Sequence, residues 1–380
     1  MAEPSARELD DALLRAVHAW RGGDEGAMDE AAFEAHAFAL LAHQLERNEP
    51  YRRFVATLGA AARAPASWRA LPAVPASAFK DATLATFDPH GAELVFETSG
   101  TTSQQSGVHY VERAALYDAS LLAGFERSML PDRPKLRYLN VVPNPRLRPR
   151  SSLGYMMGHV SVLRGEGAAG FFLGDDGVDV RGFTAALRAA ERAAQPVLIA
   201  GTAFGLATLL DGLEAARERF AAPAGSRLME TGGFKGRARV VARPELYERL
   251  AATLGIAQDR IVAEYGMTEL LTQYYDAHDS RGAGERVKVA PPWLRSVAVD
   301  AEGRPLRDGE RGYLRHVDLA NRSSVLAIDT EDVGRIAQAP DGTRGLVLEG
   351  RAPDAPPRGC SLDAEGLAAR TTAAPAAARA

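Results

Sequence analysis

The chain has 380 residues, of which 46% are hydrophobic and 25% are charged, and its formal net charge at pH 7 is −4. This length allows a large buried core, and the composition is typical of a globular enzyme. The mildly acidic charge gives no electrostatic reason to expect nucleic acid or an anionic membrane as a partner. No apolar run approaches the roughly 18 residues of a membrane span, and the charged N-terminus does not resemble a signal peptide, so we expect a cytoplasmic protein.

Cysteine and histidine spacing argue against a disulfide and against a metal cluster. Cys360 is the single cysteine, so no disulfide can form within the chain. The eight histidines include no close pair at ligand spacing. His109 and His159 lie in segments that could approach a site, but a lone histidine is more often structural, and neither is assigned a catalytic role.

Residues 1–85 are predicted to form a helical N-terminal segment that packs on the core. From Met28 to Leu45, apolar residues recur on one face of a long helix. Asn48-Glu49-Pro50 is predicted to end that helix, because the residue before a proline leaves the α region. A second helix is predicted around residues 55–62.

A turn rich in serine, threonine and glycine follows a short strand predicted at residues 94–96, and a helix is predicted at 112–127. The turn reads Thr98-Ser99-Gly100-Thr101-Thr102-Ser103-Gln104-Gln105-Ser106-Gly107. Its backbone N–H groups and hydroxyls would suit the oxygens of a polyphosphate, and each hydrogen bond to a charged oxygen contributes roughly 1.5–3 kcal/mol. The alternative is a polar surface loop, which such clusters usually are.

Strands and helices alternate through residues 86–286, which predicts an α/β layered core with a largely parallel sheet. Strands are predicted at 136–142, 196–201, 226–231 and 260–265, and helices at 178–194, 202–220 and 244–254. Ligands of such sheets bind beyond the carboxyl ends of the strands. The turns at 201–202, 231–233 and 266–268 each directly follow a predicted strand.

The turn after the strand at 226–231 contains Gly232, Gly233 and Lys235. Consecutive glycines allow the backbone to approach a flat ligand closely. Lys235 could reach a phosphate or a carboxylate from here, or could be a solvated surface lysine.

Residues 287–350 are predicted to form a β-rich subdomain. Short strands without helices are predicted at 294–299, 312–317, 325–328 and 346–349, with turn signals between them. This pattern indicates an antiparallel β appendage after the α/β core.

Two later motifs complete a set that begins with the Ser/Thr/Gly turn. They read Tyr265-Gly266-Met267-Thr268-Glu269 and Thr330-Glu331-Asp332-Val333-Gly334-Arg335, and Gly350-Arg351 follows them. In this order the four segments resemble those of the adenylate-forming superfamily, although Glu331 stands where that family usually has glycine. The resemblance implies an α/β fold of the adenylate-forming type that binds ATP and Mg²⁺.

The same resemblance implies a role for each motif. Thr98 to Ser103 would hold the phosphates, and Gly232, Gly233, Tyr265 and Gly266 would bind the nucleotide. Thr268 would lie beside the α-phosphate, and Glu269 would bind Mg²⁺ together with phosphate oxygens. Asp332 would accept hydrogen bonds from the ribose hydroxyls, with Asp329 as the competing assignment, and Arg351 would stand at a hinge.

Further segments resemble the acyl-protein synthetases of the LuxE type. They are Phe79-Lys80, the run from Thr231 to Gly236, and Arg358-Gly359-Cys360-Ser361-Leu362 after Gly350-Arg351. The resemblance covers roughly residues 75–367. It implies that a carboxylic acid of the fatty-acid class is adenylated and passed to the thiol of Cys360. From there the acyl group would go to an acyl-accepting reductase or a carrier protein.

Residues 351–380 would then be a hinge and a short tail, a truncated lid without lysine, so Lys235 is the candidate for neutralising the α-phosphate. Two alternatives stay open. One is an acyl-CoA or amide-forming ligase of the phenylacetate-CoA ligase type, and the other is a non-catalytic nucleotide-binding protein. Residues 154–160 and 170–173 are rich in Gly, Met and Phe, and either line an acyl channel or belong to the core.

Overall fold

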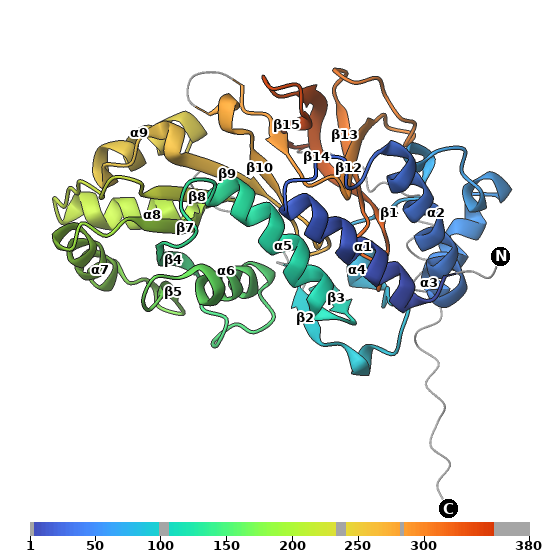
Figure 1. Cartoon of the computed structure of the whole chain (residues 1–380), viewed down its shortest axis with the longest axis horizontal. Coiled ribbons are helices and arrows are strands. Elements are labelled where there is room, and N and C mark those ends of the chain that lie inside the picture. Colours follow the sequence, from blue (N-terminus) through green and yellow to red (C-terminus); the bar gives the residue numbers. More distant parts are fainter. Residues whose placement is uncertain (1–3, 99–105, 233–240, 282–284, 353–380) are drawn as a thin grey trace, which may run out of the picture. The chain divides into compact units, whose positions relative to one another are not determined.

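The computed structural model describes residues 4–98, 106–232, 241–281 and 285–352. The chain divides into two compact units. The first unit comprises Met1–Leu116, Pro292–Ile336 and Leu348–Ala380, and the second comprises Tyr117–Pro291 and Ala337–Val347. Figure 1 labels the elements of both units. No helix among the described residues is long and apolar enough to span a membrane.

Helices at the start of the chain form one side of the first unit. They are α1 (Ala6–Arg21), α2 (Glu30–Arg47), α3 (Glu49–Thr57) and α4 (Ala78–Asp81). Ser5 and Glu8 form a capping box at the start of α1, and such a box satisfies two backbone N–H groups. The helix predicted from Met28 to Leu45 is confirmed as α2. Pro50 lies in the first turn of α3, where a missing N–H costs nothing, so the second helix begins earlier than predicted.

The β strands of the first unit pack against these helices. In sheet order they are β12 (Leu294–Val299), β13 (Gly312–Asp318) and β14 (Ala327–Gln338), all antiparallel. The short strand β1 (Val74–Pro75) pairs in parallel with β14. Trp20 of α1 meets Trp293 edge to face at 5.3 Å between ring centroids. Aromatic pairs of this geometry contribute about 0.5–1.5 kcal/mol beyond their buried area.

A separate hairpin, β2 (Leu94–Glu97) and β3 (Val108–Val111), flanks the predicted phosphate turn. β3 was not predicted from the sequence. The strands β14 and β15 (Arg344–Arg351) each run from one unit into the other.

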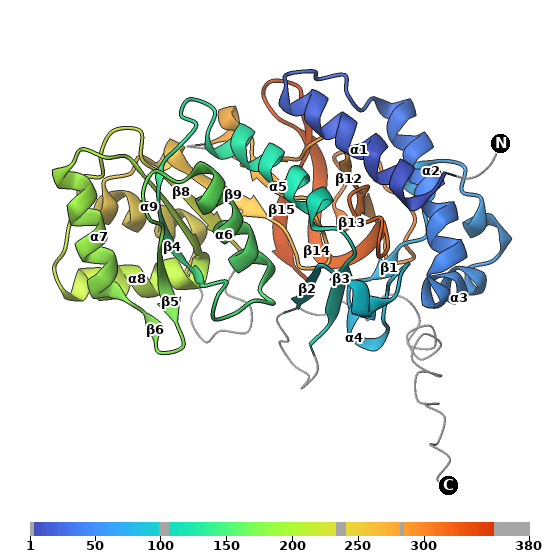
Figure 2. The same ribbon diagram turned by 60° about the horizontal axis from the view of Figure 1, so that its bottom comes forward.

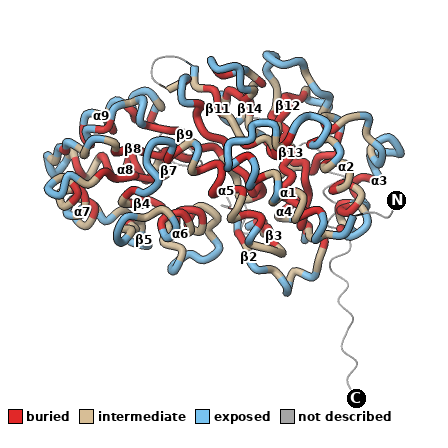
Figure 3. The backbone as a smooth tube through the Cα atoms, viewed as in Figure 1, coloured by how far each residue is buried: buried red, intermediate tan, exposed pale blue. Residues whose placement is uncertain are grey.

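The second unit is built on parallel strands. In sheet order its strands are β11 (Lys288–Val289), β10 (Tyr274–Asp276), β9 (Ile261–Tyr265), β8 (Arg227–Thr231), β7 (Val197–Thr202), β4 (Arg137–Pro143), β5 (Gly170–Gly174) and β6 (Gly177–Val178). The five from β9 to β5 pair in parallel. β10, β11 and β6 pair antiparallel at the edges. The predicted α/β core with a largely parallel sheet is therefore confirmed, and the buried strands appear in red in Figure 3.

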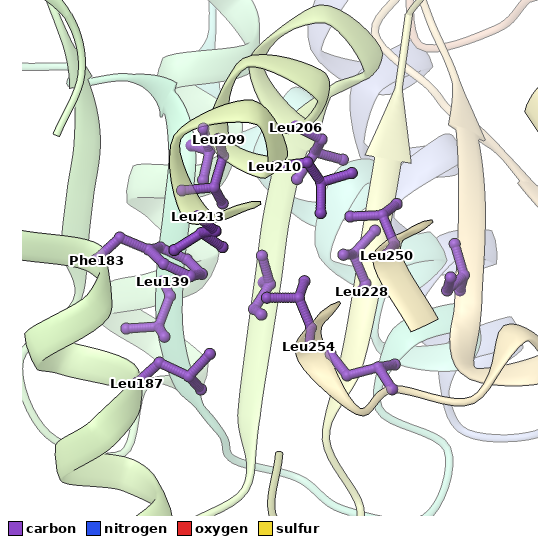
Figure 4. Close-up of a cluster of buried hydrophobic side chains, with 14 of the residues drawn as sticks. Leu139, Phe183, Leu187, Leu206, Leu209, Leu210, Leu213, Leu228, Leu250 and Leu254 are labelled. Atoms are coloured by element: carbon purple, nitrogen blue, oxygen red, sulfur yellow. The ribbon is translucent and has the colours of Figure 1, made fainter. Parts of the chain in front are cut away.

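Helices cover both faces of this sheet. They are α5 (Ala114–Met129, which begins in the first unit), α6 (Ser152–Arg164), α7 (Val180–Arg192), α8 (Ala203–Ala215) and α9 (Arg243–Leu254). Figure 2 shows α7 and α8 on one side of the strands and α6 on the other. On the α7–α9 side, leucines of α8 interdigitate with Phe183, Leu228 and Leu250 (Figure 4). Each fully buried side chain of this kind contributes roughly 1.5–3 kcal/mol.

Alternation along β4 shows how one strand serves both faces. Leu139 and Val141 point into the α7–α9 core. The Asn140 amide between them donates to Ser161 Oγ of α6 at 3.2 Å. Successive side chains of a strand point to opposite faces, so α6 and α7 must lie on opposite sides.

One prediction for this unit needs correction, and the structure also places the two segments for which a channel lining and the core were both left open. The helix predicted to reach residue 220 ends at Ala215, because Arg217 adopts a left-handed backbone with φ of 56°. Residues 154–160 belong to α6, whose Met156 and Met157 are buried. Residues 170–173 belong to β5, where Phe171 and Leu173 line a pocket of about 270 Å³ together with Asn144 and Leu147.

Candidate active site

The carboxyl ends of three neighbouring parallel strands lie in register at the same end of the second unit's sheet. Thr202 at the end of β7 pairs with Thr231 at the end of β8, and Thr231 pairs with Glu264 near the end of β9. Since ligands of parallel sheets bind beyond such ends, this end is the candidate site in this unit.

The turn after β8 exposes its backbone. Gly232 has φ of 66°, which side-chain-bearing residues rarely adopt, and in the described part of the chain no atom beyond its immediate neighbours lies within 4 Å of where a Cβ would stand. Gly232 itself is exposed. Gly233 and Lys235, predicted in the same turn, lie outside the described residues.

The turn after β9 carries the Tyr-Gly-Met-Thr-Glu motif. The N–H of Leu270 donates to the carbonyl of Met267 at 3.0 Å, so Thr268 and Glu269 occupy the centre of a tight turn. Tyr265 is buried, and its ring lies 5.9 Å from that of Tyr274. Glu269 is only 9% exposed. The motif residues therefore stand immediately beyond a buried strand, as predicted.

Helix α6 contacts this turn. Ser152 Oγ lies 3.3 Å from Thr268 Oγ1, and Ser151 caps the helix by accepting from the N–H of Gly154 at 3.1 Å. The contact orients the Thr268 hydroxyl from the opposite face to α7–α9. Sequence reasoning missed Ser151 and Ser152, although a Ser-Ser pair before an apolar run is a helix-start signal.

Glu264 is a buried carboxyl between the two turns. It is 5% exposed, and its Oε2 accepts a hydrogen bond from Thr231 Oγ1. A Cβ at Gly266 would stand 2.5 Å from Glu264 Oε1, so this carboxyl oxygen lies close to the backbone of Gly266. Burial raises the pKa of Glu264 to about 7, against the lowering effects of the Thr231 hydrogen bond and the Lys288 charge, while Glu230 adds to the rise.

Glu230, next to Thr231, points to other partners. It is fully buried, and its Oε2 accepts from the Tyr247 hydroxyl at 2.9 Å and lies 3.3 Å from Arg243 Nε. Its Oε1 has no hydrogen-bond partner among the described residues.

An ion cluster formed by Asp276 of β10, Arg286 and Lys288 of β11 supports β9. Asp276 Oδ1 lies 2.9 Å from Lys288 Nζ, and Asp276 Oδ2 lies 2.7 Å from Arg286 Nη1. The same carboxylate accepts from the N–H of Ala263 at 2.8 Å, and Lys288 donates to the Ala263 carbonyl at 3.0 Å. Burial alone would raise the pKa of Asp276, yet Lys288 and Arg286 hold it below its usual value.

In the first unit, the described ends of the predicted phosphate turn are tied together. The N–H of Thr98 donates to the Gly107 carbonyl at 2.9 Å, and the N–H of Gly107 donates to Thr98 Oγ1 at 2.9 Å. A Cβ at Gly107 would stand 3.0 Å from the Phe79 carbonyl carbon, so α4 packs on this closure. The predicted phosphate ligands Ser99, Gly100, Thr101, Thr102 and Ser103 lie outside the described residues.

The acidic segment of β14 forms a bulge. Tyr313 pairs with Val333 and Arg315 with Asp329, so Leu314 alone faces the three residues 330–332. Thr330 Oγ1 donates to the Leu314 carbonyl at 2.7 Å, and the N–H of Asp332 donates to Thr330 Oγ1 at 3.2 Å. Bulges of this kind redirect side chains and are common next to active sites.

The two candidate ribose acids differ in their surroundings. Asp329 accepts from Arg315 through both oxygens, at 2.7 and 3.0 Å. Asp332 is half-buried on the bulge. The predicted hinge residue Arg351 donates from Nε to Glu331 Oε2 at 2.7 Å, and both partners are close to half exposed. Cys360 lies outside the described residues.

The predicted Mg²⁺ ligand is the carboxylate of Glu269. Among the described residues no group of three or more His, Cys, Asp or Glu side chains could hold a metal ion. Mg²⁺ commonly takes one or two carboxylates and completes its shell with water and substrate phosphates. A single carboxylate on a strand-end turn, such as that of Glu269, fits that mode of binding.

Comparisons with known proteins agree with this architecture. The chain is 22% identical over 314 residues to a long-chain-fatty-acid–luciferin-component ligase of Vibrio harveyi, covering 81% of this chain and 80% of that protein. No protein-family model matches the chain.

Among solved structures, 2-hydroxyisobutyryl-CoA ligase in an open conformation with 2-HIB-AMP and CoA has a TM-score of 0.61 at 15% identity, covering 86% of this chain and 76% of that one. The same ligase in the postadenylation state has a TM-score of 0.62 at 14% identity, covering 85% and 67%. The predicted fold of the adenylate-forming type is therefore confirmed.

Proposed function

We propose that this chain activates a carboxylic acid of the fatty-acid class with ATP and transfers the acyl group to a protein thiol. The observation that carries the proposal is the similarity to the Vibrio harveyi ligase across four fifths of both chains. The strand-end turns support it, because the Gly232 and Thr268 turns stand side by side at the end where a parallel sheet binds its ligand.

In the first step an oxygen of the substrate carboxylate attacks the α-phosphorus of ATP. The bond from that phosphorus to the bridging oxygen breaks, pyrophosphate leaves with the electron pair, and acyl-AMP is formed. Both reactants are anions, so the site must neutralise and align them. Mg²⁺ bound to Glu269 and phosphate oxygens would supply part of the neutralisation, and Thr268 would orient the α-phosphate.

Lys235 is proposed as the further cation, and the turn from Thr98 to Ser103 as the cradle for the phosphates. Asp332 is proposed to hold the ribose hydroxyls. The bidentate pairing of Asp329 with Arg315 supports this choice, because it already engages both Asp329 oxygens.

In the second step the Cys360 thiolate attacks the acyl carbonyl carbon of acyl-AMP. The bond from that carbon to the phosphate oxygen breaks, AMP leaves, and a thioester remains on the chain. A thiol of ordinary pKa, about 8.5, is mostly protonated at neutral pH, so a nearby cation such as Arg358 would assist. An acyl-accepting reductase or a carrier protein would then take the acyl group.

The test follows a labelled acid through both steps, over a panel of fatty, aromatic and short-chain acids. Acid-dependent ATP–pyrophosphate exchange reports the first step, and label in a hydroxylamine-sensitive bond on protein reports the second. We expect Cys360→Ser to keep the exchange and to lose the protein label. If the wild type instead places the label on CoA or on an amine, the CoA or amide ligase alternative replaces this proposal. If no acid supports exchange, the chain is a non-catalytic nucleotide-binding protein.

A further inference from the structure

The buried Glu264–Thr231 contact joins the two turns of the second unit that the proposed function assigns to ATP. Thr231 directly precedes Gly232, and Glu264 directly precedes Tyr265. Their two strands are neighbours and pair in register at these residues. The Thr231 hydroxyl donates to Glu264 Oε2, so the end of β8 is tied to the end of β9 at the last paired position.

The other Glu264 oxygen lies beneath the second turn. Oε1 would be 2.5 Å from a Cβ at Gly266, so this oxygen lies close to the backbone of the residue that begins the turn carrying Thr268 and Glu269. The carboxyl is therefore placed to influence the position of this turn. The contact is buried on both sides, with Thr231 6% and Glu264 5% exposed.

Glu264 differs from the other buried acids of this region. Asp276 is paired with Lys288 and Arg286, and Glu230 with Arg243. The hydrogen bond that holds Glu264 comes from a neutral hydroxyl, and no ion pair joins Glu264 to a base of the described residues within 4.0 Å. A buried carboxyl in such surroundings costs stability, which argues for a role other than holding the fold together.

We propose that Glu264 is a positioning residue for adenylation: through Thr231 it holds the Gly232 turn and the Thr268–Glu269 turn in one arrangement for MgATP. This inference rests on the proposed function. It predicts that the hydroxyl and the carboxyl act as one unit, and that losing either impairs the use of ATP without changing the KM for the acid.

The experiment is a double-mutant cycle on the full chain. Thr231→Val removes the hydroxyl at constant volume, and Glu264→Leu removes the carboxyl. Each should lower kcat/KM for ATP in pyrophosphate exchange by roughly tenfold or more, since small misplacements in a site are costly. The double variant should be no worse than the poorer single variant, because residues that act through each other are non-additive. Thr231→Ser and Glu264→Gln keep a donor and an acceptor, and should stay within a few-fold of the wild type.

Thr253→Val is the matched control. It is the same substitution at a buried position near the C-terminal end of α9. That end of the helix leads into the start of β9, so Thr253 lies toward the amino ends of the parallel strands, away from the candidate site. It should leave the ATP kinetics unchanged even if it lowers the melting temperature. Should Thr231→Val not fold, Thr231→Ala removes the same hydroxyl and takes its place in the cycle.

Stabilisation by MgATP gives a readout that needs no acid. Saturating MgATP should raise the melting temperature of the wild type and of Thr231→Ser, and raise that of Thr231→Val much less. Wild-type ATP kinetics in Thr231→Val, or independent effects that add in the double variant, would overturn the inference alone. A wild-type protein that neither exchanges pyrophosphate nor gains stability with MgATP would overturn the proposed function with it.

Discussion

The cluster of Asp276, Lys288 and Arg286 offers a sharp test of what supports the strand before the Tyr-Gly-Met-Thr-Glu motif. Asp276 is 1% exposed and Lys288 is 2% exposed. Asp276→Asn keeps the size of the side chain but removes the charge that both bases contact. Breaking a buried ion pair from one side typically costs about 3–5 kcal/mol, because the remaining charge stays buried.

The expected change in melting temperature follows from this free-energy cost and from the size of the folding unit. For a unit of this size, each kcal/mol shifts the melting temperature by roughly 2–4 °C, so Asp276→Asn should lower it by roughly 6–20 °C. Thermal unfolding followed by circular dichroism measures the shift. Adding Lys288→Met should recover part of the loss, since an apolar replacement of the pair leaves less buried charge unpaired.

The matched control is Asp175→Asn, which removes an acid from an ion pair with Arg148 that is exposed on both sides. It should change the melting temperature by little, because exposed pairs contribute little. A melting temperature of Asp276→Asn within 2 °C of the wild type, at roughly the precision of such a comparison, would refute the reasoning.

The pH dependence gives the same test a second readout. The pKa of Asp276 is lower in the folded protein, so its stabilisation is fully present above its unfolded pKa of about 3.9 and is lost as pH falls through the folded pKa. Wild-type melting temperature should therefore fall more steeply below about pH 4 than that of Asp276→Asn.

Three further predictions concern other parts of the chain. Glu269→Gln should lower pyrophosphate exchange by at least about tenfold, because it removes the proposed charge contact with Mg²⁺; unchanged exchange in a folded variant would exclude the role. Asp332→Asn should raise the KM for ATP, while Asp329→Asn should mainly lower the melting temperature; the reverse result would mean that Asp329 binds the ribose. Leu210→Ala, in the core drawn in Figure 4, should cost about 2–5 kcal/mol in urea unfolding, and a cost below 1 kcal/mol would contradict close packing around α8.

The parallel strands could be predicted because local sequence marks both of their ends. β7, β8 and β9 are apolar runs that stop at a Gly- or Thr-containing turn, and each was predicted to within two residues. The end of α8 carries no such mark. The chain leaves the helix through Arg217 in the left-handed region, where glycine is usual, so nothing in the residue types signals the stop.

The glycines of α6 have a cause outside the helix, which the sequence alone does not reveal. A Cβ at Gly158 would stand 2.8 Å from Pro145 Cγ, and one at Gly154 would stand 2.8 Å from the Pro143 carbonyl oxygen. Both glycines therefore allow the end of β4 and the residues after it to pack closely against α6. From the sequence alone the same glycines, with two methionines between them, are compatible with the lining of a channel or with the core.

The candidate site was only partly accessible to sequence reasoning. Motif residues such as Thr268 and Glu269 are consecutive, so a pattern along the chain finds them. Glu264, Asp276 and Lys288 form a group only because β9, β10 and β11 are neighbours in the sheet. Strand order is set by tertiary packing, and no local pattern records it.

The choice between Asp329 and Asp332 as the ribose-binding acid depends on the strand register of β13 and β14, which the motif alone does not give. In an unbroken strand these residues, three apart, would point to opposite faces. The bulge opposite Leu314 breaks that alternation, so counting along the chain cannot say which acid faces a ligand. The pairing of Arg315 with Asp329 places that acid in a structural ion pair, and the bulge begins immediately after it. The proposed ribose-binding acid Asp332 lies within the bulge, whereas Glu331 beside it accepts a hydrogen bond from Arg351. We therefore expect loss of the Asp332 carboxylate to weaken ATP binding.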